Sequence, residues 1–462
     1  MSSYSPWACQ SAPGAIERVA CCSVHESAID GRTIVRLDDW LDLAARARPD
    51  HPAVESAAGA FSYAELDAAA TLTARRLAAL GVGEGDRVAT TMRPGPDFAA
   101  LLHALPRLGA ALVPLNTRLP AQGQRRQSDL AGAMMVIDEP LDDGFETDFE
   151  PRLLLDPDAV HTVLFTSGTS AEPKPVELTV ANQAASAAAS QAVFGYGPAD
   201  RWLCPLPLFH IGGLAILVRC ARAGATAVLA DRLDAATLEG ITLASVVATQ
   251  LRRLRDAGVT EAPGLRAFVL GGGPVPADIL EWARGHGLPV RSTYGMTETC
   301  SQVAVTAPWE RTAAVVPGAE LAIGEDDQIL VRGPMVAPGA LAPDGWLHTG
   351  DVGRINRDGL LSVEGRLKDL IVSGGENVAP PAVEAVLTAH PAIADAAVAG
   401  VPDPEWGEAV TAYVVERRPV SDYELLGFCR EHLAGYQVPK AVIRVAELPR
   451  NAAGKLERGR LG

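Results

Sequence analysis

A turn rich in hydroxyl groups is the first place where this chain could do chemistry. Residues 165–179 read FTSGTSAEPKPVELT and follow an apolar run. In such a turn, backbone N–H groups and hydroxyls donate hydrogen bonds to phosphate oxygens, and a lysine adds positive charge. Taken alone, the pattern fits a phosphate-binding turn and an ordinary surface loop equally well. The stretch carries four hydroxyl residues around Gly168, together with Lys174: Thr166, Ser167, Thr169 and Ser170.

The turn is not the phosphate-binding loop of the Walker type. That loop needs glycine before its lysine and a magnesium-binding serine or threonine after it. Here Lys174 follows Pro173, and Pro175 stands at the next position.

Three later stretches carry further polar groups. Residues 292–302, STYGMTETCSQ, combine aromatic Tyr294, the hydroxyl of Thr297 and the carboxylate of Glu298. Residues 347–380 contain Asp351, Arg366 and a glycine-rich turn, SGGEN. Residues 448–458, LPRNAAGKLER, place Lys455 after a glycine. Taken alone, Lys455 reads as a solvated lysine near the end of the chain.

In this order the four stretches resemble the adenylate-forming superfamily, which includes acyl- and aryl-CoA synthetases, adenylation domains and luciferases. The resemblance covers about residues 35–461. It implies an acid–CoA ligase that uses ATP, Mg²⁺ and CoA. The acid would first form an acyl-AMP with release of pyrophosphate, and a thiol would then displace AMP. Such catalysis consists largely of positioning and charge neutralisation.

The resemblance also implies a role for each matching residue. The turn at 166–174 would hold the β- and γ-phosphates, Thr297 the α-phosphate, and Glu298 the magnesium ion. Tyr294 would stack on adenine beside Gly272 and Gly295. Asp351, assisted by Arg366, would accept hydrogen bonds from the ribose hydroxyls. Lys455 would bridge the attacking carboxylate and the α-phosphate.

The second half-reaction needs a different arrangement, since Lys455 would occupy the space that the thiol must enter. The resemblance implies that a small C-terminal domain rotates about Lys368. The turn containing Gly374, Gly375 and Glu376 would then line the path of CoA.

The acid pocket is expected around CPLPLFHIGGLAILVRCARAGATAVL, residues 204–229. With GGGPVP and YGMTETCSQ, this stretch most resembles the o-succinylbenzoate–CoA ligases of menaquinone biosynthesis. His210 would gate the pocket, Gly271 and Gly273 would form its floor, and Ser301 and Gln302 would line it. Arg219 is the candidate partner for the substrate carboxylate that does not react. A core histidine and a structural ion pair are the ordinary alternatives for His210 and Arg219.

The phosphate turn departs from the superfamily pattern T-G-x-P-K-G. Ser170 and Ala171 replace the threonine and the glycine, and Pro175 replaces the last glycine. Proline removes a backbone donor. Three alternatives therefore remain: a ligase for another aryl or fatty acid, a stand-alone enzyme that loads a carrier protein, and a non-catalytic nucleotide-binding relative.

The elements that position these residues follow an α/β pattern. Short apolar strands alternate with helices up to about residue 317, which predicts parallel βα layers. A small β-barrel-like subdomain should follow, and then a small, mobile α+β domain. We expect an N-terminal extension over 1–34, a large domain over 35–367 and a small domain over 368–462. Residues 35–54 read as an amphipathic helix, and Ser62 with Glu65 predicts a capping box that starts a second helix.

The composition and net charge of the chain limit the kinds of molecule that it is expected to bind. The chain has 462 residues, 48% of them hydrophobic, with 40 basic and 56 acidic residues, a net charge of −16. Such an acidic chain is a poor general partner for nucleic acid. We expect no integral membrane segment and no secretory signal, and the seven cysteines are expected to be reduced thiols of a cytoplasmic protein. The sequence leaves open whether the chain is a monomer or a homodimer.

Overall fold

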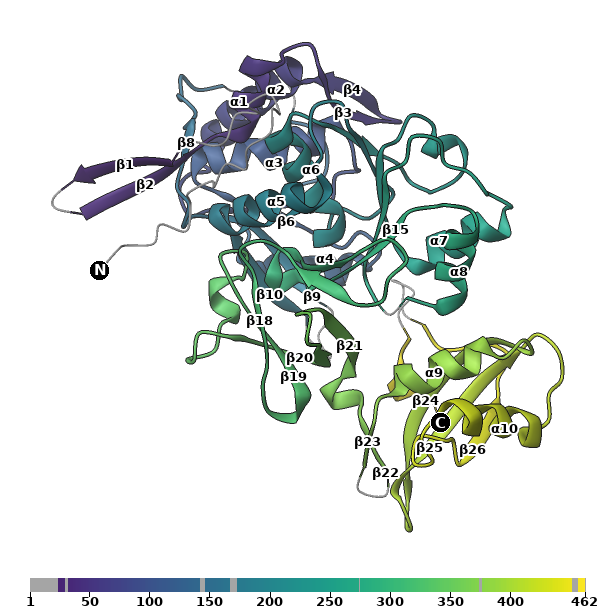
Figure 1. Cartoon of the computed structure of the whole chain (residues 1–462). Helices are drawn as coiled ribbons and strands as arrows, with labels where there is room; N and C mark the ends of the chain where they lie inside the picture. The colour runs from purple at the N-terminus through teal and green to yellow at the C-terminus, as the bar shows by residue number, and fades with distance from the viewer. Residues whose placement is uncertain are drawn as a thin grey trace.

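The computed structural model describes residues 24–29, 32–141, 146–166, 173–273, 275–373, 376–450 and 456–461. In Figure 1 the chain forms a large body, coloured purple to green, and a smaller one at its yellow C-terminal end. The first contains two sheets that carry parallel strands, together with most of the helices.

Six neighbouring strands of the larger sheet are parallel. Each of these strands pairs in parallel with its neighbours. β4 (Gly59–Ser62) adds an antiparallel strand at one edge of the sheet. This confirms the parallel βα layers that the short apolar runs predicted. In spatial order the six are β3 (Pro52–Ser56), β12 (Thr226–Leu229), β11 (Arg201–Cys204), β13 (Leu243–Val246), β14 (Ala267–Leu270) and β15 (Val290–Met296).

The second sheet has four parallel strands and one antiparallel edge strand, β10 (Lys174–Thr179). Pro175 lies on β10, where a missing N–H is tolerated because only one side of an edge strand is paired. The parallel strands are β7 (Met135–Ile137), β5 (Arg87–Thr90), β6 (Ala111–Pro114) and β9 (Val160–Thr166).

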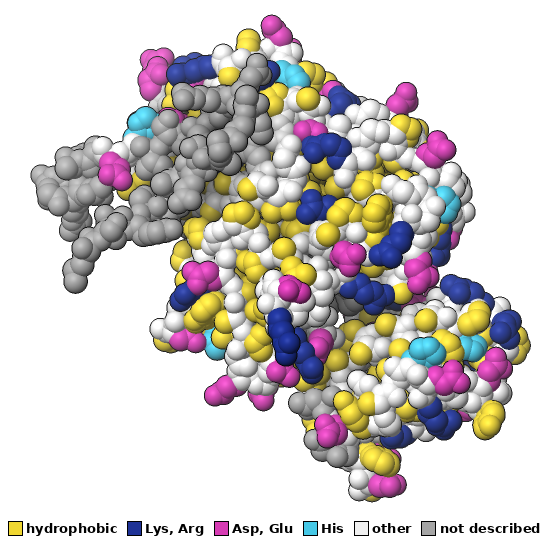
Figure 2. Space-filling model, viewed as in Figure 1, with side chains coloured by type: hydrophobic (Ala, Val, Ile, Leu, Met, Phe, Trp, Pro, Cys, Tyr) yellow, Lys and Arg dark blue, Asp and Glu magenta, His cyan; other side chains and the backbone are white. Residues whose placement is uncertain are grey.

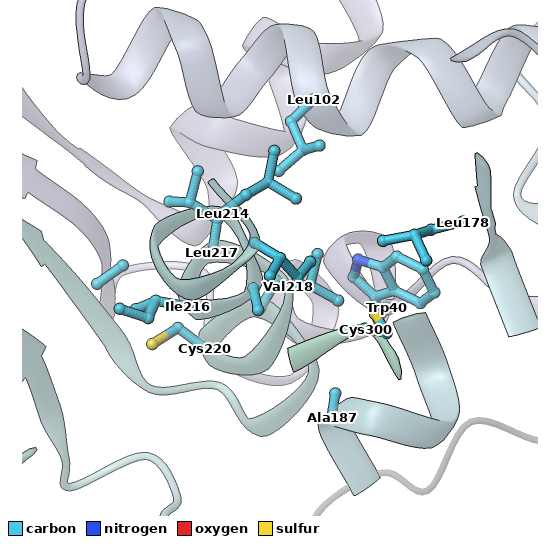
Figure 3. Packing of buried hydrophobic residues seen from close by; sticks show 14 of the residues in the cluster. Trp40, Leu102, Leu178, Ala187, Leu214, Ile216, Leu217, Val218, Cys220 and Cys300 are labelled. Atoms are coloured by element: carbon cyan, nitrogen blue, oxygen red, sulfur yellow. The ribbon is translucent and has the colours of Figure 1, made fainter. Parts of the chain in front are cut away.

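Helices α1, α2, α3, α5 and α6 share one core, whereas α7 and α8 pack in a separate apolar cluster. Figure 3 shows Leu102, Leu178, Ala187 and Leu214 in the same cluster, and these residues come from α3, β10, α5 and α6. The capping box at Ser62 and Glu65 is confirmed at the start of α2. The helices of this body are α1 (Trp40–Ala47), α2 (Tyr63–Ala79), α3 (Pro96–Leu108), α4 (Ala121–Ala131), α5 (Val180–Phe194), α6 (Ile211–Ala223), α7 (Ala248–Asp256) and α8 (Ala277–Gly285).

An antiparallel region continues the larger sheet beyond β15, where the sequence predicted a small β-barrel-like subdomain. It carries the pair β20–β21, which positions Asp351 opposite Arg366. Its strands are β16 (Ser301–Thr306), β17 (Ala313–Val315), β18 (Glu320–Ile323), β19 (Gln328–Arg332), β20 (Leu347–Ile355) and β21 (Leu361–Arg366).

The C-terminal body has a sheet and an apolar core of its own. Two helices, α9 (Pro380–Ala389) and α10 (Asp422–His432), pack with this sheet. Its strands are β22 (Ile371–Ser373), β23 (Glu376–Val378), β24 (Ile393–Asp403), β25 (Gly407–Glu416) and β26 (Ala441–Arg444). This α+β composition is as expected, and the division at residue 368 stays a prediction.

The helix predicted over residues 35–54 is wrong at both ends, because α1 spans only Trp40–Ala47 and residues 52–54 already belong to β3. Residues up to Asp38 form strand β2 (Arg32–Asp38), which pairs with β1 (Val24–Ile29) and β8 (Leu154–Leu155). Asp39 then caps α1 by accepting hydrogen bonds from two backbone N–H groups, so the helix begins only at Trp40. β-branched Thr33, Ile34 and Val35 favour the strand. The N-terminal extension predicted over residues 1–34 therefore runs into a β-hairpin, and residues 1–23 lie outside the described part.

The described cysteines agree with the expected thiols. Cys204, Cys220, Cys300 and Cys429 are free and buried. Burial raises the pKa of the Cys204 thiol to about 12, so this group stays protonated. No helix in the described ranges is long and apolar enough to cross a membrane. Basic and acidic side chains are intermingled on the face shown in Figure 2.

Two buried histidines make the large body sensitive to acid. Trp40 donates a hydrogen bond to His103 on α3, and its ring lies 5.6 Å from that of His161 on β9. Neither ring nitrogen of His161 has a hydrogen-bond partner among the described residues. Burial lowers the pKa of both histidines from 6.5 to about 3. Above pH 6.5 both histidines are neutral in the folded and in the unfolded chain. Below pH 6.5 the unfolded chain binds protons that the folded chain does not, so the free energy of unfolding decreases as the pH falls towards 3.

We therefore expect His161→Leu to reduce the acid sensitivity of folding. Each such histidine costs about 1.4 kcal/mol per pH unit below 6.5, or roughly 2 kcal/mol at pH 5. Urea unfolding at pH 7 and pH 5 should show a smaller loss for the variant than for the wild type. Substitution of the exposed His286 by glutamine is the control. An unchanged loss in His161→Leu would contradict the assignment.

Candidate active site

The loops after the parallel strands bring the predicted residues to one edge of the larger sheet. Because β11, β13, β14 and β15 are neighbours and parallel, their carboxyl ends meet there. His210 precedes α6 after β11, and Gly271 to Gly273 follow β14. Tyr294 lies near the end of β15, just before Thr297 and Glu298.

A hydrogen-bonded cluster joins three of the predicted nucleotide residues. The Tyr294 hydroxyl donates to Asp351 Oδ2 at 3.0 Å, and Arg366 Nε lies 2.7 Å from Asp351 Oδ1. Asp351 and Arg366 are also register partners on β20 and β21. Burial and the Asp351 carboxylate raise the pKa of Tyr294 well above its usual value, so the phenol remains a donor.

The Asp351 carboxylate is held in place before any ligand arrives. Its residue is only 6% exposed, and its backbone N–H donates to Thr349 Oγ1 at 3.0 Å. Thr349 in turn donates to the carbonyl of Ile329 on β19. A carboxylate can accept about four hydrogen bonds. It can therefore bind two neighbouring hydroxyls without releasing Arg366.

Thr297 and Glu298 sit on a tight turn, η2 (Thr297–Thr299), between β15 and β16. The buried Thr299 hydroxyl accepts from the N–H of Met296 and lies 2.8 Å from the Ser301 carbonyl. Cys300 has φ 50° and Ser301 has φ 96°. Left-handed backbone costs a non-glycine residue about 1–2 kcal/mol, so the turn stores strain. The side chains of Thr297 and Glu298 remain partly exposed.

The turn η2 lies against β9 and β10, the two strands of the phosphate-turn prediction. Thr166 ends β9, Lys174 begins β10, and the two residues are register partners. The structure thus brings Thr166 and Lys174 towards Thr297 and Glu298. Three other predicted phosphate ligands, Ser167, Gly168 and Thr169, lie outside the described residues, as do Lys455, Gly374 and Gly375.

His210 directly follows Phe209, which lines a cavity of about 370 Å³. The cavity lies at the carboxyl ends of β5, β6, β11 and β12. Desolvation by the surrounding protein atoms is the main cause that lowers the pKa of the His210 imidazole, and the positive charge of Arg118 lowers it further. Arg118 itself lies over the Phe209 ring. Sequence reasoning missed Arg118, because "LNTRL" contains no signal beyond a lone arginine after a strand.

Arg219 lies inside the core rather than on a surface. It is 2% exposed on α6, with its guanidinium 5.6 Å from the centre of the Trp202 ring. Nε and Nη2 have no hydrogen-bond partner among the described residues. Burial lowers the pKa of Arg219, although Tyr196 and Cys300 oppose the shift. An unpaired buried cation is costly, so these two donors favour an anionic ligand over a structural ion pair.

The glycines of the site differ in their surroundings. A Cβ on Gly295 would lie 1.7 Å from the Ser301 carbonyl oxygen, so backbone packing alone requires glycine there. Gly272 has φ 88°, and a Cβ added there would contact the side chain of Val247. A Cβ added on Gly273 would meet no atom within 4 Å. Gln302, expected to line the pocket, instead donates to Ser190 on α5 and is buried.

The hinge candidates lie close to this cluster along the chain. Lys368 is exposed on η5 (Leu367–Asp369), two residues after Arg366. Glu376 is exposed at the start of β23.

A larger cavity, about 580 Å³, lies at the opposite edge, beside the amino ends of β5, β6 and β9. Its arginines already have partners: Arg36 pairs with Asp156, Arg87 with Glu177 and Arg152 with Glu84. We assign no site there.

Comparison with known families places this geometry in a class. Residues 41–341 match the AMP-binding enzyme family, and residues 382–455 match the AMP-binding enzyme C-terminal domain. The chain belongs to this family of AMP-forming, adenylate-forming enzymes, as the four motifs indicated.

Its relatives narrow the class further. The 2-succinylbenzoate–CoA ligase of Bacillus licheniformis is 38% identical, over 92% of this chain and 99% of that protein. Two structures of o-succinylbenzoate CoA synthetase from Bacillus subtilis are 34% identical, each with a TM-score of 0.85. One structure contains the acyl-adenylate intermediate, and the alignment covers 98% of its chain. The other contains ATP and magnesium, and the alignment covers 99% of its chain. Each alignment spans 92% of this chain.

A pair of glycine substitutions tests the packing of the nucleotide turn. We expect Gly295→Ala to lower the free energy of unfolding by about 1–3 kcal/mol, since its Cβ would overlap backbone. The variant should also bind Mg·ATP more weakly. Gly273→Ala, in open space, should change the free energy of unfolding by no more than about 0.5 kcal/mol. Urea unfolding and calorimetric titration measure both, and equal behaviour of the two variants would contradict the packing argument.

Proposed function

We propose that this chain is an o-succinylbenzoate–CoA ligase that acts in the cytoplasm. The acid carboxylate attacks the α-phosphorus of ATP, forming an acyl-AMP and releasing pyrophosphate. The thiol of CoA then attacks the acyl carbon, and AMP leaves with the carboxylate oxygen. The Tyr294–Asp351–Arg366 cluster carries the nucleotide half of this proposal. The relatives of that name support the substrate, and the buried free thiols support a reducing compartment.

In the first half-reaction the described residues would bind and orient ATP. Asp351 accepts the two ribose hydroxyls while Arg366 holds the carboxylate. The Tyr294 ring, fixed through its hydroxyl, offers a face for adenine near Gly272 and Gly295. Thr297 donates to the α-phosphate, and Thr166 and Lys174 contact the outer phosphates. Ser167, Gly168, Thr169 and Lys455 would complete this set.

The site also fits a magnesium ion. Mg²⁺ prefers oxygen ligands, often one or two carboxylates together with substrate phosphates. Glu298 supplies a partly exposed carboxylate beside the phosphate residues, and it has no ion-pair partner within the described ranges. When bound there, the ion would neutralise phosphate charge.

The acid pocket would extend from His210 towards Arg219. His210, Gly271, Gly273 and Ser301 would form its entrance. Arg219 would offer Nε and Nη2 to the second carboxylate of the substrate, pairing two charges that would otherwise be buried alone. The orphaned guanidinium is the observation that favours a dicarboxylic acid.

The second half-reaction would use the C-terminal body as a mobile unit. We propose that it rotates at Lys368, which is exposed between β21 and β22. Gly374, Gly375 and Glu376 would then approach the acyl-AMP and guide the thiol.

The direct test is a product assay. The purified chain, Mg·ATP and CoA would be incubated with o-succinylbenzoate, benzoate, salicylate, a medium-chain fatty acid or amino acids, and AMP and acyl-CoA followed by mass. We expect o-succinylbenzoyl-CoA from the wild type and none from Lys455→Ala. AMP formed only with another acid would overturn the substrate. ATP binding without AMP formation from any acid would indicate a non-catalytic relative.

Arg219→Met separates a substrate contact from a structural role. We expect kcat/KM for o-succinylbenzoate to fall roughly 100-fold, because a charge-assisted hydrogen bond is lost. The free energy of unfolding should stay equal or rise, since an unpaired buried charge is removed. Arg222→Met is the matched control, because Arg222 lies one turn further along and stacks over Trp40 instead. A large loss of stability would show that Arg219 is structural.

A further inference from the structure

Helix α5 carries a buried stripe of polar side chains that the mechanism above does not use. The helix is otherwise rich in alanine and follows β10 directly. Four of its polar residues are at most 4% exposed: Asn182, Gln183, Ser186 and Ser190. Buried polar groups require partners, so their contacts show what the stripe holds.

Gln183 bonds to two segments at once. Its Nε2 donates to Thr162 Oγ1 at 3.1 Å, and its Oε1 accepts from the Cys300 thiol at 3.2 Å. All three residues are at most 1% exposed. Thr162 lies on β9, four residues before Thr166, and Cys300 lies two residues after Glu298. One amide therefore connects the strand that carries Thr166 with the turn that carries Thr297 and Glu298.

Ser186 holds the same turn from one side only. Its hydroxyl donates to the Cys300 carbonyl at 2.6 Å. Cys300 is the residue with φ 50°, so this bond stabilises the left-handed backbone that closes the turn. Among the described residues no hydrogen bond joins the Ser186 hydroxyl to β9, so Ser186 is a matched control for Gln183.

We propose that Gln183 is a positioning residue that sets the separation between Thr166 and Lys174 on β9–β10 and the Thr297–Glu298 turn. The proposal rests on the proposed function in taking Mg·ATP as the ligand that spans both segments. A ligand bound at two places loses affinity when their separation is no longer fixed, because binding must then pay the ordering entropy. A ligand that touches one segment is not affected in this way. AMP, with no β- or γ-phosphate, is such a ligand.

The test compares Mg·ATP and AMP binding by calorimetry, without acid or CoA. We expect Gln183→Met, which is similar in size but makes no such bonds, to weaken Mg·ATP binding about 10-fold and AMP binding less than about 3-fold. Thr162→Val should show the same selective loss, and Cys300→Ser, which keeps a donor, should bind both as the wild type does. Ser186→Ala should weaken both ligands equally.

Three results would overturn the proposal. The first is equal weakening of Mg·ATP and AMP in Gln183→Met and Thr162→Val, which would mean general damage to the turn. The second is no weakening of either ligand. The third is a wild-type chain that does not bind Mg·ATP, which would also remove the ATP chemistry. A wild type that binds Mg·ATP but makes no o-succinylbenzoyl-CoA would overturn only the proposed substrate. If Gln183→Met does not fold, the nearly isosteric Thr162→Val decides.

Discussion

The burial of α6 on all its sides constrains the rest of the site. Eleven of its thirteen residues are buried, and its sequence, IGGLAILVRCARA, is apolar around almost the whole circumference. A helix of this kind must lie within a core rather than on it. The preceding loop also approaches closely, since a Cβ on Gly213 would lie 2.5 Å from the Pro207 carbonyl oxygen. His210 is thereby held at the sheet edge and Arg219 in the interior.

Around this helix the chemistry is concentrated where strands end. Parallel neighbours deliver their loops to one edge, while the antiparallel pair β20–β21 brings Asp351 to Tyr294 from a distant part of the chain. The strained turn at Cys300 and the buried polar stripe on α5 also hold polar groups in fixed positions. Rigid elements hold the polar groups in place before the nucleotide binds, so less ordering is needed on binding.

Much of the fold was accessible from local patterns. The short apolar strands, the capping box at Ser62 and the antiparallel strands after Pro317 all depend on neighbours within a few residues. The β1–β2 hairpin was not predicted, because Val35 to Asp38 also fit a helical period until β8 supplies a partner strand. Arg118 and the α5 stripe were missed for a related reason: a lone arginine, or a glutamine among alanines, has no meaning without the surface that it faces.

By itself the sequence determined the order of the motifs, the alternation of strands and helices, and the residue types able to bind phosphate, ribose and a metal ion. Those properties are local, since they follow from composition and spacing along the chain. Only the tertiary structure decided that Asp351 would meet Tyr294 and Arg366, that Gln183 would join β9 to the Thr297 turn, and that Nε and Nη2 of Arg219 would find no hydrogen-bond partner in the described part of the chain. These contacts link residues far apart in the chain, and they exist only once the sheets and helices have packed.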